Sequence, residues 1–202
     1  KSPSKGWIKE EGLPEEIPVQ YAANGASAIS ILTEEHFFGG HLKYIKIARP
    51  LVQCPILRKD FIVDPYQIYQ ARIIGADAIL LIAAALTVDE CKRLAAKAHE
   101  LSLEVLLEIH SEKELEYLNE HIDMIGVNNR NLGTFHTDVE NSFRLAGKLP
   151  KETLLVSESG ISQPETIKQL RQAGFRGFLI GETFMKTAVP GETLRTFIQT
   201  LQ

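Results

Sequence analysis

The chain has 202 residues, 44% of them hydrophobic and 24% charged, and its 22 basic and 26 acidic residues give a net charge of −4. This composition predicts one globular domain over residues 1–202 with a single hydrophobic core. The sequence shows no basic block of the kind that follows a nucleic-acid backbone, and no apolar run of the ~20 residues that a membrane helix needs. We therefore expect neither nucleic acid nor a membrane as a partner.

The two cysteines, Cys54 and Cys91, lie far apart and form neither a CxxC pair nor a pattern with histidine. This spacing predicts no metal site and no disulfide. No signal peptide is visible in the sequence either. We therefore expect reduced thiols and a cytoplasmic protein.

Seven short apolar runs alternate along the chain with segments whose apolar residues recur every three or four positions. The apolar runs cover residues 26–33, 55–63, 76–84, 103–109, 124–128, 153–156 and 177–180. The periodic segments cover residues 65–74, 87–102, 111–120, 139–149, 163–173 and 191–201. Continuous apolar runs are typical of strands buried on both faces, and the other spacing is typical of helices. The alternation predicts parallel strands joined by right-handed crossovers.

Seven such units favour an α/β fold, the (β/α)8 barrel, from which the first strand is missing. A closed barrel of this kind needs eight strands, and the opening KSPSKG has the composition of a loop that follows one. Because the sequence also begins at Lys1 rather than Met, we expect an N-terminal truncation. Two unpaired edges would then make this chain aggregate more readily, and work less well, than a version restored upstream. An open doubly wound sheet is the alternative, but its GxGxxG turn is absent.

Polar clusters follow most of the predicted strands, in ILTEE, LRKDF, LLEIH, GVNNRN, VSESG and LIGET. A parallel barrel works at the carboxyl ends of its strands, so these clusters predict an active-site lining. Lys59 has apolar neighbours, and we expect burial to lower its pKa and suit it to proton donation; an ion pair with Asp60 is the alternative. Glu108 projects inward if Leu106 does, and an inward carboxylate favours acid–base work. His110 is expected at the rim.

Two further groups of residues suggest anion binding. The side chains of Asn128, Asn129 and Arg130 suit a carboxylate, although asparagines also cap loops in any context. Glycine turns follow the last two predicted strands, in SESGIS and GET, where phosphate-binding barrels offer backbone N–H groups near helix N-termini. Lys1 and Ser2 in the opening loop would close this site from the other side, unless that loop is a plain solvated turn.

The motifs KSPSKG, SILTEEHFFGG, PILRKDFIVDPYQIYQARIIGADAILLI, LEVLLEIHS, IGVNNRNL, SESGIS and FLIGETFM resemble, in order, those of indole-3-glycerol phosphate synthase. The resemblance covers essentially the whole chain. It implies a TIM barrel that converts 1-(2-carboxyphenylamino)-1-deoxyribulose 5-phosphate to indole-3-glycerol phosphate in tryptophan biosynthesis. Carbon dioxide and water are lost, and no cofactor or metal takes part. The partner is then a phosphorylated small molecule, and we expect a monomer or a weak homodimer.

The resemblance also implies roles for individual residues. Lys59 matches the general acid that protonates the ribulose carbonyl oxygen, and Glu108 matches a second acid–base group that assists the dehydration. Asn128 matches the family residue that holds a substrate hydroxyl, and Arg130 matches the neighbouring residue that contacts the substrate carboxylate. Other matches are Glu158 and the catalytic Ser159 after the last strand but one, Phe38, Phe61 and Leu80 around the anthranilate ring, and Lys1, Ser2, Gly160, Gly181 and Glu182 at the phosphate.

The chain departs from the family at its start. Family members carry a Glu and a Lys on the first strand, and a helical extension before it, and the sequence begins after both. A non-catalytic barrel remnant is therefore one alternative. Another is a phosphate-binding barrel isomerase, which would share the glycine turns but typically uses two carboxylates, or Asp with Cys. The pairing of LRKDF with LLEIH argues against that isomerase.

Overall fold

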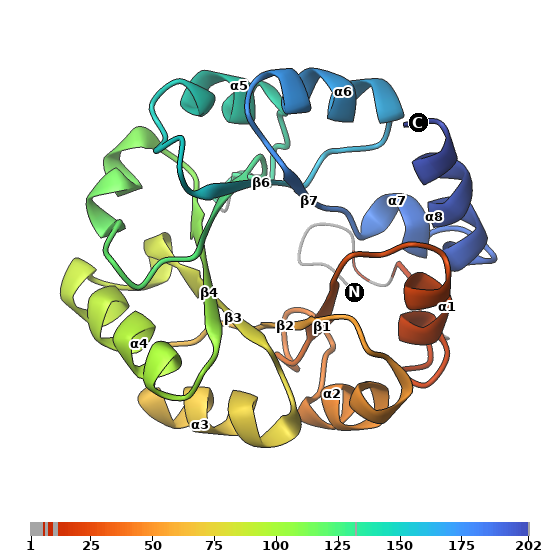
Figure 1. The fold of residues 1–202 in the computed structure, drawn as a ribbon, viewed down its shortest axis with the longest axis horizontal. Coiled ribbons are helices and arrows are strands. Elements are labelled where there is room, and N and C mark those ends of the chain that lie inside the picture. Colours follow the sequence, from red (N-terminus) through yellow and green to blue (C-terminus); the bar gives the residue numbers. More distant parts are fainter. Residues whose placement is uncertain (1–5, 7, 10–11, 132, 202) are drawn as a thin grey trace.

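The structure is a computed structural model that describes residues 6, 8–9, 12–131 and 133–201. The predictions for Lys1 and Ser2 lie outside these residues. Seven parallel strands form one curled sheet, and helices surround it on the outside (Figure 1). The strands are β1 (Ile29–Leu32), β2 (Ile56–Lys59), β3 (Ala78–Ile82), β4 (Glu104–Ile109), β5 (Met124–Asn128), β6 (Leu154–Glu158) and β7 (Gly177–Leu179).

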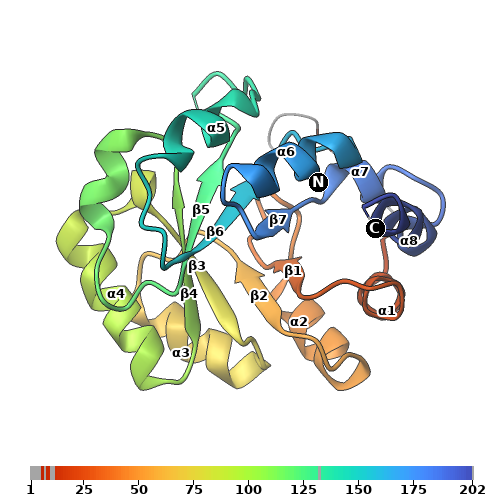
Figure 2. The same cartoon turned by 45° about the horizontal axis from the view of Figure 1, so that its top comes forward.

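Helices cover the outer face of the sheet, and most of them lie in the connections between successive strands (Figures 1 and 2). They are α1 (Ile17–Ala23), α2 (Leu42–Ala48), α3 (Pro65–Ile74), α4 (Val88–Glu100), α5 (Glu140–Ala146), α6 (Pro164–Gln172), α7 (Glu182–Met185) and α8 (Pro190–Gln199). Short 3-10 helices are η1 (Arg49–Leu51), η2 (Ala83–Ala85) and η3 (Glu112–Tyr117). None of the helices in the described residues has the length and hydropathy of a membrane-spanning segment.

The strand order follows the chain from β1 to β7, and every neighbouring pair is parallel. All seven predicted strands are therefore confirmed, and the arrangement is that of a TIM barrel with seven strands in the described residues. Such an order requires right-handed crossovers through the outer helices, which the strand–helix alternation predicts. The carboxyl ends of all seven strands consequently open on the same side of the sheet.

One prediction about helices needs correction, and three helices were missed. Within the predicted helix over 111–120, only residues 112–117 are helical, and they form the 3-10 helix η3 instead of an α-helix, because the chain becomes extended at Leu118. Helices α1, α2 and α7 were not predicted, since each spans seven residues or fewer and is too short for a clear periodic pattern. A capping box formed by Thr87 and Glu90 begins α4, and Gly75, in a left-handed conformation, ends α3.

The core has two layers, separated by the sheet. A large cluster fills the space between the strands and the outer helices, and a smaller one fills the inside of the barrel. The inner cluster consists of Leu57, Ala78, Leu80, Ile82, Leu106 and Val156. Side chains alternate along a strand, so Glu108, two residues after Leu106, projects into the same interior. The inward placement expected for Glu108 is therefore confirmed.

Candidate active site

Three charged side chains meet inside the barrel at the carboxyl ends of their strands. Lys59 Nζ lies 3.4 Å from Glu108 Oε2 and 3.9 Å from Glu158 Oε2. Their side chains are 17%, 2% and 1% exposed, respectively. The three come from β2, β4 and β6, so that every other strand in this part of the sheet contributes one. An ammonium between two buried carboxylates is a candidate centre for acid–base chemistry.

The alternative pairing of Lys59 with Asp60 is wrong, because Asp60 has another partner. Asp60 Oδ2 accepts hydrogen bonds from Arg58 Nη2 at 2.8 Å and from Thr33 Oγ1 at 2.6 Å. Arg58 is itself buried and also donates from Nε to Thr33 Oγ1 at 3.0 Å. A buried ion pair whose hydrogen bonds are satisfied holds the end of β2 in place, directly beside Lys59.

Lys59 carries a proton in this arrangement, and the reason differs from the one expected. Burial acts to lower the pKa of Lys59, but the Glu108 and Glu158 carboxylates outweigh burial and raise the pKa above its usual value. Burial has the expected direction, but the expectation of a lowered pKa for Lys59 is wrong. An apolar sequence neighbourhood predicts desolvation but does not reveal the two carboxylates that strands β4 and β6 bring close. Lys59 is thus a charged proton donor at neutral pH.

The two carboxylates differ in charge state although they face the same ammonium. For Glu108, burial acts to raise the pKa, but the Lys59 ammonium and the Asn128 amide, 2.9 Å from Oε1, lower it below its usual range. For Glu158, burial and then the charge of Glu108 raise the pKa to about 8. At neutral pH the site therefore holds one ionised and one neutral carboxyl group, which is an arrangement suited to acid–base chemistry.

Asn128 and Arg130 extend the site along the loop after β5. Asn128 donates to Glu108 through Nδ2 and accepts the Arg130 backbone N–H at 2.9 Å through Oδ1. The Arg130 guanidinium lies 3.7 Å from Glu182 Oε2 and 3.3 Å from Thr137 Oγ1. The cluster of positive and negative groups thus continues from the barrel interior toward α7.

Asn129 does not face the site, so for this residue the loop-capping alternative is correct. Its Nδ2 donates to Ser157 Oγ at 3.1 Å and to the Ser159 carbonyl at 3.0 Å. Its Oδ1 accepts from the backbone N–H and the hydroxyl of Ser142 on α5. All of these contacts are internal, and they tie α5 to the end of β6.

The turn after β6 has an unusual backbone at the predicted anion site. Ser159 and Gly160 both have left-handed conformations, with φ of 68° and 75°. A Cβ on Gly160 would lie 2.6 Å from Thr137 Cγ2, so a larger residue does not fit there without a shift. Gly181 precedes the short helix α7, and its carbonyl accepts from the N–H groups of Phe184 and Met185. Both glycine turns therefore stand at the carboxyl ends of β6 and β7, as predicted.

Aromatic rings form a wall on the other side of the mouth. Phe38 stacks on Phe61 with ring centres 5.6 Å apart, and Phe37 meets Phe61 edge-on at 6.0 Å. Phe61 also packs against the inner cluster that contains the buried Leu80. The Glu34 carboxylate holds this loop, because it accepts the backbone N–H groups of three successive residues, 36–38. Phe37 was not predicted, and only its place next to Phe38 hinted at a role.

The profile of the family described as indole-3-glycerol phosphate synthase matches residues 1–197. The chain belongs to this family. It is 70% identical to the indole-3-glycerol phosphate synthase of Bacteroides thetaiotaomicron over the whole chain and 78% of that protein. It is also 49% identical to that of Aliarcobacter butzleri, over 99% of the chain and 76% of the relative.

Two solved structures share the fold at low sequence identity. Both are crystal structures of KGPDC from Streptococcus mutans, and the second of them is a complex with a ligand. Their TM-scores are 0.72 and 0.75, with 14% and 13% identity over 93% of this chain and 90% and 91% of theirs. This likeness concerns the fold alone. The catalytic assignment of indole-3-glycerol phosphate synthase, a carboxy-lyase of tryptophan biosynthesis, comes from the family.

His110 differs from its expected place. Its side chain is 14% exposed, and Nε2 lies 3.3 Å from Glu108 Oε1, so the residue packs against the acid–base group instead of standing at the rim. Sequence reasoning also missed Arg58 and Thr33, which carry no signal beyond their places in predicted strands. The described residues contain no group of three or more His, Cys, Asp or Glu side chains that could hold a metal ion.

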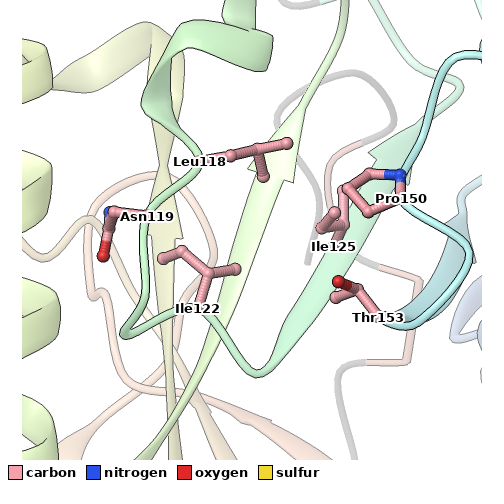
Figure 3. A pocket seen from close by; sticks show the side chains of 6 residues that line it. All are labelled: Leu118, Asn119, Ile122, Ile125, Pro150 and Thr153. Atoms are coloured by element: carbon pink, nitrogen blue, oxygen red, sulfur yellow. The ribbon is translucent and has the colours of Figure 1, made fainter.

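A separate pocket of about 270 Å³ lies at the amino ends of β5 and β6, on the opposite side of the barrel (Figure 3). Figure 3 shows Leu118 and Ile122 on one side of the hollow, with Ile125, Pro150 and Thr153 on the other. Its lining has no charged side chain. Parallel barrels carry their chemistry at the carboxyl ends of the strands. We therefore interpret this pocket as a packing gap at the amino ends of the strands, the lower face of the barrel, and not as a functional site.

Gly126→Ala is expected to damage the site from inside β5. An added Cβ would lie far inside van der Waals distance of Glu158 Oε1 and 3.1 Å from its Cδ. Glu158 must then move, and overpacking of this kind destabilises by about 1–3 kcal/mol. Urea denaturation and turnover should both show the loss. Gly147→Ala is the matched control, because a Cβ there meets nothing within 4 Å, and equal behaviour of the two variants would contradict the prediction.

Glu158→Gln is expected to change stability in a way that depends on pH. Folding raises the pKa of Glu158 from 4.5 to about 8, so the folded state keeps a proton that the unfolded state releases. The carboxyl's contribution to the free energy of unfolding is therefore full below pH 4.5, falls as pH rises, and is lost above about pH 8. Glutamine does not titrate, so the variant does not lose stability in this way as pH rises. Denaturation at several pH values should show its stability rising relative to the parent chain across this window; a constant difference would refute the assignment.

Proposed function

We propose that this chain closes the indole ring of 1-(2-carboxyphenylamino)-1-deoxyribulose 5-phosphate, with Lys59 as the general acid. The observation that supports this most is the Lys59 ammonium, held 3.4 Å and 3.9 Å from two buried carboxylates. The aromatic carbon attacks the ribulose carbonyl, and negative charge develops on the carbonyl oxygen. A proton donor fixed in a water-poor interior stabilises this charge more in the transition state than in the bound substrate.

Glu108 is proposed as the group that assists the dehydration. Its carboxylate is ionised, because Lys59 and Asn128 lower its pKa against the effect of burial. It can therefore accept the proton that the methylene carbon beside the nitrogen releases as the double bond forms. Glu158, whose pKa is about 8, is neutral at pH 7 and can donate a hydrogen bond to a substrate hydroxyl.

The rest of the site is proposed to hold the two ends of the substrate. Phe38, Phe61 and Leu80 enclose the aromatic ring and replace water around it. Asn128 contacts a hydroxyl and Arg130 the carboxylate, in keeping with their place beside Glu108 and Glu182. We assign the phosphate to the turns of Gly160, Gly181 and Glu182, with Lys1 and Ser2 from the opening loop.

An assay with the synthetic substrate tests this proposal directly. We expect indole absorbance to appear together with carbon dioxide in equal amounts. Binding without turnover would overturn the catalytic proposal and favour a barrel that binds only. Turnover without release of carbon dioxide would point instead to isomerase chemistry. Both results are distinguishable in one experiment if product and gas are measured in the same sample.

A further inference from the structure

The proposed reaction consumes one proton in every turnover, and this follows from its atoms. The substrate's ionised carboxyl group leaves as carbon dioxide and takes no hydrogen with it. The carbonyl oxygen leaves as water with two hydrogens, of which the methylene carbon beside the nitrogen releases one. The other must be supplied as a proton. The buried acid–base site is therefore one proton short after each cycle, and solvent has to replace it.

His110 lies between this site and a second, more exposed carboxylate. Its Nε2 is 3.3 Å from Glu108 Oε1, and its Nδ1 is 3.9 Å from Glu114 Oε2 on η3. Both ring nitrogens are buried, yet neither makes an aligned hydrogen bond within the described part of the chain. Unbonded buried polar atoms are uncommon in folded proteins and call for an explanation.

The backbone of His110, in contrast, is firmly held. Its N–H donates to Glu114 Oε2, which also accepts the Ser111 N–H at 3.0 Å. Its carbonyl accepts from Asn141 Nδ2 on α5 at 3.1 Å. The main chain is thus fixed on both sides, while no hydrogen bond from the residues that the structure describes holds the ring. Each ring nitrogen nevertheless lies near a carboxylate oxygen, at 3.3 Å for Nε2 and 3.9 Å for Nδ1.

We propose that His110 is a proton relay that returns a proton from solvent to the Lys59 and Glu108 pair after each turnover. The inference rests on the proposed function. A neutral imidazole accepts a proton at one nitrogen while it donates from the other. The proton arrives at Nδ1 from the side of Glu114, leaves Nε2 for Glu108 Oε1, and passes from Glu108 to Lys59 across their 3.4 Å contact. The ring then carries its proton on Nδ1, and it turns so that the protonated nitrogen faces Glu108 before the next transfer.

The charges around the relay come from several elements. On its own strand the ring faces Glu108, and from η3 it faces Glu114. Lys59 on β2 lies beyond Glu108, and Glu158 on β6 lies beyond Lys59. From α5, Arg144 donates to Asn141 Oδ1, which places a cation behind the amide that holds the His110 carbonyl.

His110→Gln tests the relay through its response to added imidazole. At saturating substrate we expect kcat to fall at least about 10-fold, since positioned proton transfer contributes that much or more. Imidazole in the buffer should restore kcat in proportion to its concentration, with KM and the melting temperature little changed. A loss of kcat that imidazole does not restore, or no loss at all, would overturn the proposal.

His99→Gln is the matched control. His99 also faces a carboxylate, with Nε2 2.9 Å from Asp123 Oδ2, but it lies on α4 and contacts the segment before β5, at the lower face of the barrel. Its replacement should leave kcat unchanged at every imidazole concentration. An equal response of both variants to imidazole would mean general buffer catalysis and would also overturn the relay.

A second measurement needs no turnover, and it separates a failure of the relay from a failure of the proposed function. Ring ¹⁵N chemical shifts of His110 report which nitrogen carries the proton. We expect Nε2 to carry it in the parent chain, facing the Glu108 carboxylate, and Glu108→Gln to shift the balance toward Nδ1. Identical His110 spectra in the two proteins would overturn the inference, whether or not the chain turns over substrate and whether or not His110→Gln folds.

Discussion

Lys59→Ala is expected to lower kcat by roughly 10²–10⁴-fold, the range that a positioned general acid contributes. Substrate affinity should change little, because the proton is needed mainly in the transition state. Removal of the ammonium also leaves Glu108 and Glu158 without the charge that lies 3.4 Å and 3.9 Å away. Turnover at saturating substrate and binding measured by calorimetry together check this prediction.

Lys168→Ala is the matched control for this variant. Lys168 lies on α6 and is half-exposed. Its Nζ is 4.0 Å from Oε2 of Glu165, one turn earlier, which is a long contact for an ion pair. Exposed pairs of this kind contribute little to stability, so both turnover and melting should stay close to those of the parent chain. If Lys59→Ala weakened binding but kept full turnover at saturation, Lys59 would be a binding residue and not the general acid.

Glu108→Gln is expected to reduce kcat by a similar factor, roughly 10²–10⁴-fold, for a different reason. Glutamine keeps the shape of the side chain and can still accept from Asn128 through its carbonyl oxygen. It cannot accept a proton from the methylene carbon, so the dehydration should stall after carbon dioxide has left. Single-turnover measurements should therefore show a burst of carbon dioxide ahead of the indole absorbance.

The control for Glu108→Gln is Glu165→Gln on the exposed face of α6, which should release carbon dioxide and form indole at equal rates. The same equality in Glu108→Gln, with both rates lowered together, would place Glu108 in the first step and contradict its role in the dehydration. Because Glu108 also lies 3.4 Å from Lys59, the double variant should lose less than the product of the single effects.

The sequence was sufficient to predict the strands and the end of the barrel that carries the candidate active site. Runs such as 76–84 and 103–109 are mostly apolar without strict alternation, and both contain strands buried on their two faces. Polar residues in the last positions of such strands must share one end of a parallel sheet, which placed Lys59, Glu108 and Asn128 together. The weaker predictions concerned short helices. The six-residue η3 and the seven-residue α1 and α2 carry too few turns for a periodic pattern to stand out.

The charge states of the site residues could not be predicted from the sequence. A pKa depends on the groups that surround a side chain in space, and the nearest ones to Lys59 are 49 residues and almost a hundred residues away in the chain. The same holds for Asp60, which is next to Lys59 in sequence but pairs with Arg58 and Thr33. Neighbouring residues on a strand point to opposite faces, so Lys59 and Asp60 cannot pair although they are adjacent in sequence. Asp60 instead pairs with Arg58, two residues away and on the same face.

The amino-acid sequence by itself determined the alternation of strands and helices, the family, and which residues stand at the carboxyl ends of the strands. Only the tertiary structure decided that Lys59 is charged, that Glu108 is ionised and Glu158 neutral, that Gly126 makes room for Glu158, and that His110 packs against Glu108. The physical reason is that hydrophobic patterning is local along the chain, whereas desolvation and Coulomb interactions depend on distances across the barrel.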